Sequence, residues 1–136
     1  MQTNESIARC ETSVSIAEFD RRGVLFWRYK PEVRVTLTEA QEEVDAFVPL
    51  IREHLGGRSL LLIDIRDIKS VTRAARNVFS SELTHELGGV QGLALVMGSP
   101  LSVAIGNIYQ KINRPPHPTR LFTDSEQALA WLLELN

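Results

Sequence analysis

The sequence predicts a single α/β domain, residues 1–136, with the element order ββαβαβαβα and a mixed, mainly parallel sheet with helices. Two observations predict this fold class. Short apolar runs of strand length alternate with longer segments whose apolar residues recur at helical spacing, and no linker or repeat interrupts the alternation. Parallel strands require right-handed crossovers, and an N-terminal hairpin adds an antiparallel element. We expect residues 1–12 to form a flexible N-terminal segment.

The hairpin is predicted from two runs of β-forming residues, 13–19 and 24–29. They are joined by the sequence DRRG, in which Gly23 can adopt the positive φ that a tight turn often requires. The two runs therefore form the first two predicted strands.

The first helix is predicted over residues 38–57. Thr38 and Gln41 have the spacing of a capping box, and Gly56 and Gly57 close the segment. Pro49 lacks a backbone donor, so we expect the helix to kink or to break in two there. The apolar stripe consists of Ala40, Val44, Phe47, Ile51 and Leu55.

Residues 60–65 carry apolar side chains on both alternating faces, which is typical of a strand buried beneath helices, and we expect this strand at the centre of the sheet. A second helix is predicted over residues 72–87, and residues 92–97 form another buried strand. The apolar stripe of that helix consists of Ala75, Val78, Phe79 and Leu83.

The last elements are a third helix, a short strand and a fourth helix. Ser99 is placed as the N-cap of the third helix, with Pro100 at its first position. A proline-rich loop leads to a strand at residues 120–122. Thr123 and Glu126 then have capping-box spacing before the final amphipathic helix.

Charge and composition exclude several classes of function. The chain has 15 basic and 17 acidic side chains, so its net charge of -2 does not favour nucleic acid as a partner. Cys10 is the only cysteine, which excludes an internal disulfide and suits a reducing compartment. The apolar runs are shorter than the roughly 20 residues that span a bilayer, and the N-terminus does not resemble a secretory signal. We expect a cytoplasmic protein without a membrane span.

Three stretches resemble a known family. The segments LLIDIRDIKSVTRAAR, ALVMGSPLSVAIGNIYQKINRPPHPTRLF and FTDSEQALAWL are similar to the SpoIIAA-like, STAS-related families of small bacterial proteins, some of which are described as STAS/SEC14-like. The similarity spans residues 13–135. It implies a SpoIIAA-like fold for most of the chain.

The resemblance also raises the hypothesis of a phosphorylation switch. In the anti-sigma-factor antagonists of the STAS superfamily, a phosphorylatable serine follows an aspartate at the start of the helix after the buried strand. When Asp64 is matched to the aspartate that ends that strand, Thr72, Arg73 and Ala74 occupy the positions of the Asp-Ser-Ser run. The acceptor serine is therefore replaced by a large cation, which argues against a phosphorylation switch.

The carboxyl edge of the parallel strands is the default place for a ligand or partner site. Lys69 and Arg73 would favour an anion there. The interpretation we prefer is that Thr72 caps the helix, that Asp67 stabilises the turn, and that the two cations lie in solvent. The candidate site residues are Asp64, Asp67, Ser70, Thr72, Arg73, Ser99 and Thr123.

No motif predicts an enzyme. The three histidines lack close metal-ligand spacing, and the chain has no G-x-S-x-G elbow, no P-loop and no G-x-G-x-x-G. We therefore predict no catalytic residues, no bound metal and no cofactor.

The predicted function is a non-catalytic, STAS-like binding or regulatory module that acts through protein–protein interaction. We also expect a homodimer, because aromatic and basic residues alternate at positions 25–30 on a hairpin at the sheet edge. The alternative is a SEC14-like carrier or sensor of a small apolar ligand. Its pocket would be lined by Val103, Ile108, Tyr109, Ile112, Phe47 and Ile51.

Overall fold

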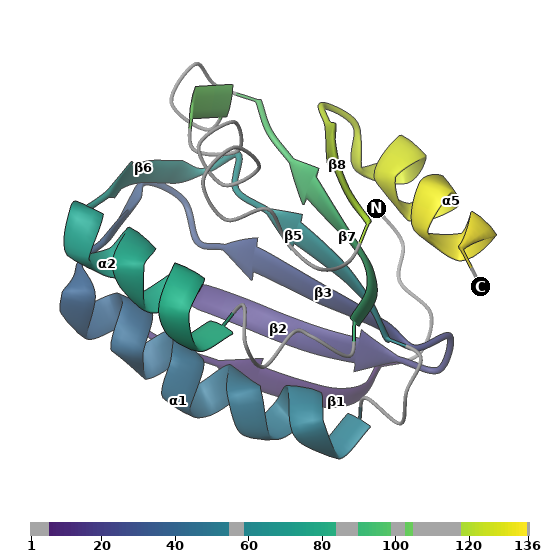
Figure 1. Ribbon diagram of the computed structural model, residues 1–136, viewed down its shortest axis with the longest axis horizontal. Helices are drawn as coiled ribbons and strands as arrows, with labels where there is room; N and C mark the ends of the chain where they lie inside the picture. Colours follow the sequence, from purple (N-terminus) through teal and green to yellow (C-terminus); the bar gives the residue numbers. More distant parts are fainter. Residues whose placement is uncertain (1–5, 55–58, 84–89, 99–102, 105–117, 136) are drawn as a thin grey trace.

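A six-stranded sheet forms the centre of the molecule in the computed structural model, which describes residues 6–54, 59–83, 90–98, 103–104 and 118–135 (Figure 1). The first two pairings, β1 with β2 and β2 with β3, are antiparallel, and the other three are parallel. The predicted mixed, mainly parallel α/β sheet is therefore confirmed. Its strands lie in the order β1 (Ser6–Glu11), β2 (Ser15–Asp20), β3 (Val24–Tyr29), β5 (Ser59–Asp64), β7 (Val90–Val96) and β8 (Thr119–Phe122).

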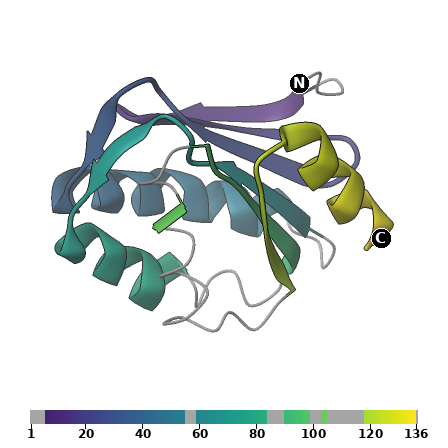
Figure 2. The same ribbon diagram turned by 90° about the horizontal axis from the view of Figure 1, so that it is seen from above.

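A small second sheet and the helices complete the described fold. Strands β4 (Val33–Val35) and β6 (Ile68–Val71) pair in parallel with each other. The helices are α1 (Leu37–His54), α2 (Arg73–Val78) with its π-helical continuation η1 (Phe79–Leu83), and α5 (Ser125–Glu134). Figure 2 shows α1 and α2 below the main sheet, with α5 on its other side.

Alternating residues of the strands supply the two faces of the sheet. Leu61 and Ile63 of β5 belong to the core beneath α1, whereas Leu60 and Leu62 belong to the core beneath α5. All four are at most 9% exposed. The prediction of a central strand buried on both faces is confirmed, because β5 lies between β3 and β7.

The predicted turn between β2 and β3 is also confirmed. Gly23 has a φ of 82°, and its N–H donates to the carbonyl oxygen of Asp20 over 3.2 Å. The Asp20 carboxylate accepts hydrogen bonds from the backbone N–H groups of Arg22 (2.9 Å) and Val24 (3.2 Å). A side chain that bonds its own turn in this way stabilises the hairpin.

Two helix starts differ from the sequence prediction. Helix α1 begins at Leu37, and the Glu39 carboxylate accepts from the Thr36 N–H over 2.9 Å, so the capping interaction lies two residues before the predicted one. Helix α5 is capped by Asp124 rather than by Thr123. At both helix starts the carboxylate of a residue near the predicted one accepts the capping backbone N–H. This carboxylate belongs to Glu39 in α1 and to Asp124 in α5. Helix α1 is not broken at Pro49.

The N-terminal strand was not predicted. Residues 6–11 form β1, which takes the edge of the sheet and leaves β3 in its interior. Phe26, Trp27 and Tyr29 are at most 7% exposed. The predicted dimer surface at positions 25–30 is therefore wrong, because the aromatic residues of this strand belong to the two cores. Most of the predicted third helix lies outside the described residues.

Candidate functional site

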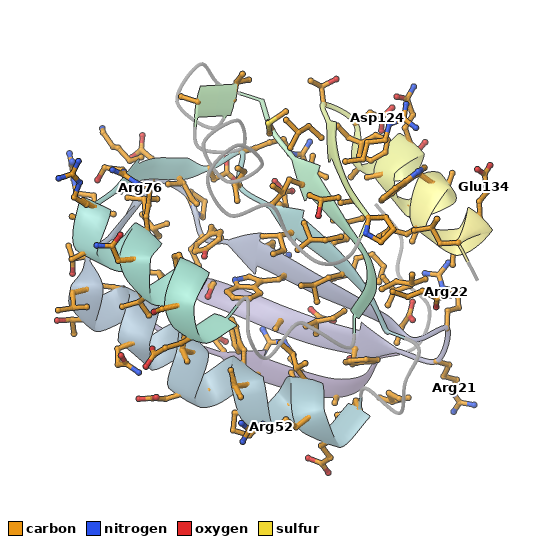
Figure 3. The ribbon with its side chains drawn as sticks, in the orientation of Figure 1. Arg21, Arg22, Arg52, Arg76, Asp124 and Glu134 are labelled. Carbon is orange, nitrogen blue, oxygen red and sulfur yellow. The ribbon has the colours of Figure 1, made fainter. Side chains whose placement is uncertain are left out.

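Three parallel strands end together at one edge of the sheet. The N–H of Ile65 donates to Val96 over 3.0 Å, and that of Met97 donates to Phe122 over 2.7 Å, so β5, β7 and β8 stay in register to their carboxyl ends. This is the edge at which we predicted a ligand or partner site. Figure 3 shows Asp124 at the start of α5, beside this edge.

An ion pair occupies the end of β5. The guanidinium group of Arg66 forks onto the carboxylate of Asp64, with Nε 3.0 Å from Oδ1 and Nη2 2.6 Å from Oδ2. The pKa of Arg66 is raised, mainly by its hydrogen bonds to Asp64 and further by the charges of Asp64, Asp67 and Asp124. Asp64, Asp67 and Asp124 therefore share the electrostatic environment of one cation, which we call the strand-end cluster together with Arg66.

The stem of Arg66 also lies across the neighbouring strand. A Cβ atom added to Gly98, just after β7, would stand 3.0 Å from Cγ of Arg66 and 3.1 Å from its Cδ. The stem of Arg66 thus packs against the backbone at Gly98, although its side chain as a whole is 42% exposed. Thr123 is exposed at the end of β8, and Ser99 lies outside the described residues.

The other predicted residues, Ser70, Thr72 and Arg73, lie where β6 leads into α2. Thr72 caps α2, since its side chain accepts from the Ala75 N–H over 3.2 Å. Its own N–H donates to Val35 over 3.0 Å and so anchors the start of the helix to β4. Ser70 therefore belongs to the β4–β6 sheet, and Thr72 and Arg73 belong to the start of α2. None of the three is part of the ion pair at the end of β5. The role of Thr72 as a cap is confirmed.

A buried carboxyl group on α1 was not predicted as a feature of interest. Glu43 has no exposed surface, and its Oε2 accepts from Ser15 Oγ (2.6 Å) and from the indole N–H of Trp27 (3.1 Å). Its Oε1 accepts from the Tyr29 hydroxyl over 3.2 Å. We call Glu43 and these three donors the Glu43 network. It joins α1 to the two neighbouring strands β2 and β3.

Burial dominates the electrostatics of this network. Removal from water raises the pKa of Glu43 from 4.5 to about 7, although the hydrogen bonds from Ser15, Tyr29 and Trp27 oppose the shift. The pKa of Tyr29 is raised well above its usual value, first by its own burial and then by the charge of Glu43. The sequence held a signal for this network: Glu43 falls between Ala40 and Phe47 on the buried stripe of α1.

A shallow groove runs between α1 and η1, with a volume of about 450 Å³. Its apolar wall comes from Val44, Val48 and Pro49, and its rim includes Asp45 and Glu82. The apolar pocket predicted for a carrier is a different place. Phe47 and Ile51 are fully buried in the core, Val103 is 39% exposed, and the remaining predicted lining residues lie outside the described ranges.

Within the described residues, no group of three His, Cys, Asp or Glu side chains is placed to hold a metal ion. None of the helices in those ranges is both long and apolar enough to cross a membrane.

The chain matches one family model and is similar to a solved structure. A family model described as a domain of unknown function, DUF7793, matches residues 18–136. No curated protein matches the chain. The chain is similar to the crystal structure of an uncharacterized protein from the DUF3478 family with a SpoIIAA-like fold, from Shewanella loihica PV-4. The identity is 17%, the TM-score is 0.60, and the match covers 97% of this chain and 98% of that one. The predicted SpoIIAA-like fold is confirmed.

Proposed function

The chain belongs to the DUF7793 family and has a SpoIIAA-like fold, and from this premise we propose that it is a non-catalytic binding or regulatory module that acts through protein–protein contacts. The fold alone does not specify this activity. The proposal depends on how the described residues fill the places where a small molecule would bind.

The observation that carries the proposal is the position of Arg66. A small molecule bound to a parallel sheet normally occupies the crevice at the carboxyl ends of adjacent strands. Here the stem of Arg66 lies over Gly98 and its guanidinium group is paired with Asp64. The protein's own cation therefore lies across the edge between β5 and β7 where a ligand would bind, and its charge is already paired with Asp64.

The chemistry of the other polar groups supports the same proposal. Thr72 is engaged as a helix cap, and the carboxyl group of Glu43 is enclosed in the core without access to solvent. A catalytic acid or base must come within hydrogen-bond reach of its substrate. The groove between α1 and η1 is shallow and has a polar rim, which suits contact with another protein surface better than enclosure of a lipid tail.

Native mass spectrometry of the full chain, purified gently from its own cells, tests the proposal. We expect the chain without a bound small molecule, in complexes whose extra mass is accounted for by protein subunits. The same spectrum reports whether those subunits are further copies of this chain, as the predicted homodimer requires. A stoichiometric apolar ligand would instead support the carrier hypothesis, and turnover of a co-purified metabolite would contradict a non-catalytic module.

A further inference from the structure

Four cations from three elements come together at one corner of the molecule: Arg34, Lys69, Arg73 and Arg76. We call this set the basic corner. Strand β4 pairs with β6 so that Arg34 lies opposite Ser70. The chain then turns at Thr72 into α2, which contributes the other two arginines. Figure 3 shows Arg76 near the junction of β6 and α2.

Local structure directs these side chains outward. Val33 pairs with Ile68 and Val35 pairs with Val71, and all four apolar residues pack on the core beneath α1. The register of the β4–β6 pairing shifts after Val33, so β6 has two residues, Lys69 and Ser70, where β4 has only Arg34. Arg34, Lys69 and Arg73 are exposed as a result.

The guanidinium group of Arg76 is held at the same corner. Its Nη1 donates to the carbonyl oxygen of Val71, the last residue of β6, over 2.9 Å. Arg76 is therefore half-buried and fixed, whereas the other three cations are exposed around it. A fixed guanidinium group loses little conformational freedom when it binds a carboxylate.

Nearby carboxylates leave the charges of Arg34, Lys69 and Arg73 largely uncompensated. Asp67 acts on Arg66 in the strand-end cluster, and Glu39 is bonded to Thr36 at the start of α1. Glu32 is the exposed acid closest to Arg34 in the chain. Among the described residues, no carboxylate forms an ion pair with Arg34, Lys69 or Arg73. The corner is thus locally positive on a chain whose net charge is -2.

We propose that the basic corner binds a short acidic segment of a partner protein. The inference rests on the proposed protein–protein function and names the surface and the chemistry of the partner. Arginine recognises carboxylates through paired hydrogen bonds, and complementary charge favours encounter with the correct partner.

The surroundings of the corner favour a short acidic segment over a long polyanion. Helix α1 packs against α2 and carries the exposed carboxylates Glu42 and Asp45. A nucleic acid strand or an anionic membrane presents negative charge over a larger area, and the net charge of -2 on the whole chain does not favour such a partner. A peptide with a few acidic residues can contact the corner alone.

Binding of fluorescein-labelled deca-glutamate, measured by fluorescence anisotropy on the full chain, tests the proposal. We expect binding at low salt that weakens as salt rises, and a loss of about fivefold in affinity when Arg34→Gln and Arg73→Gln are combined. The control combines Arg9→Gln and Arg28→Gln, which removes the same charge from the face of β1 and β3. These two arginines lie near Glu18 in the native fold.

The outcomes separate this inference from the proposed function. Retained affinity in the control, together with a loss in the corner variant, supports the basic corner. Equal losses in both variants, an absence of binding at low salt, or tighter binding of a ten-residue oligothymidine would overturn it, while partner subunits seen in native spectra would still support the module. If the double variant does not fold, Lys69→Gln at its exposed position replaces it, with an expected loss of about twofold.

Discussion

The Glu43 network and the strand-end cluster each contain a carboxylate that accepts several hydrogen bonds, but the donors differ. Asp64 accepts from a guanidinium group, and its side chain is 19% exposed. Glu43 accepts from two hydroxyls and an indole N–H, and it has no exposed surface. One carboxylate is therefore neutralised by a cation at the surface, and the other is enclosed with neutral partners.

The contrast shows that hydrogen bonds alone do not offset the burial of a charge. Three donors surround Glu43, yet its pKa rises to about 7 because the core removes the carboxylate from water. The network holds α1 at one position on β2 and β3, since its three donors come from those strands. Because the buried position disfavours the charged form, we expect the free energy of unfolding to fall when Glu43 is ionised.

The largest effect is expected from Glu43→Ala. Truncation leaves the Ser15 and Tyr29 hydroxyls and the Trp27 indole N–H without their buried acceptor, and each such group costs about 1–3 kcal/mol. We expect the free energy of unfolding at pH 5.5, where Glu43 is mostly protonated, to fall by about 4 kcal/mol. Urea denaturation followed by circular dichroism measures this change.

Glu53→Ala is the matched control, because Glu53 is an exposed glutamate on the same helix. Its replacement should change the free energy of unfolding by less than about 0.5 kcal/mol. If Glu43→Ala also changed the free energy of unfolding by less than about 0.5 kcal/mol, the Glu43 network would contribute little to stability. The buried carboxylate would then not differ from the surface carboxylate in its effect.

The second prediction concerns pH. Glu43 has a pKa of about 7 in the folded chain against 4.5 as its ordinary value, so the folded state binds more protons between these values. Stability should therefore fall as pH rises from about 4.5 to about 7 and should then level off. The shift corresponds to about 3 kcal/mol in the free energy of unfolding. Urea denaturation across this pH range measures it.

Comparing the pH dependence of stability in the native chain and in Glu43→Gln isolates the contribution of Glu43. Glutamine does not titrate, so the fall in stability between pH 4.5 and 7 should shrink by most of its size in the variant. The lowered pKa values of Glu11 and Glu39 act in the opposite direction, with stability lost as pH falls below about 4.5, and they are common to both proteins. Identical pH profiles would mean that another group is responsible.

Much of the fold follows from local patterns in the sequence. The strand at residues 60–65, the hairpin with Gly23 and the final helix were predicted because periodicity and turn chemistry act over a few residues. Strand β1 was missed because Ser6–Glu11 contains three exposed polar residues, Ser6, Arg9 and Glu11, and its pairing with β2 decides its conformation. The edge position of β3 was consequently wrong.

The candidate site was predicted only in part, for a related reason. The topology does bring Asp64, Asp67 and the start of α5 to one edge, as parallel strands require. It does not bring Ser70, Thr72 and Arg73 into that cluster, because residues 68–71 pair with β4 instead. The role of Arg66 depends on a contact with Gly98, 32 positions further along the chain, which no local pattern reveals.

The smallest effect is expected from Thr72→Ala, which removes a helix cap at the protein surface. The hydroxyl of Thr72 satisfies one backbone N–H at the start of α2, so its loss should lower the free energy of unfolding by about 1 kcal/mol. Thr123→Ala is the control, because Asp124 caps α5 in its place and the change should be close to zero. Thermal unfolding of both variants measures the difference. Equal effects would remove the evidence that Thr72 acts as a cap, whereas the expected order places its contribution well below that of the buried network.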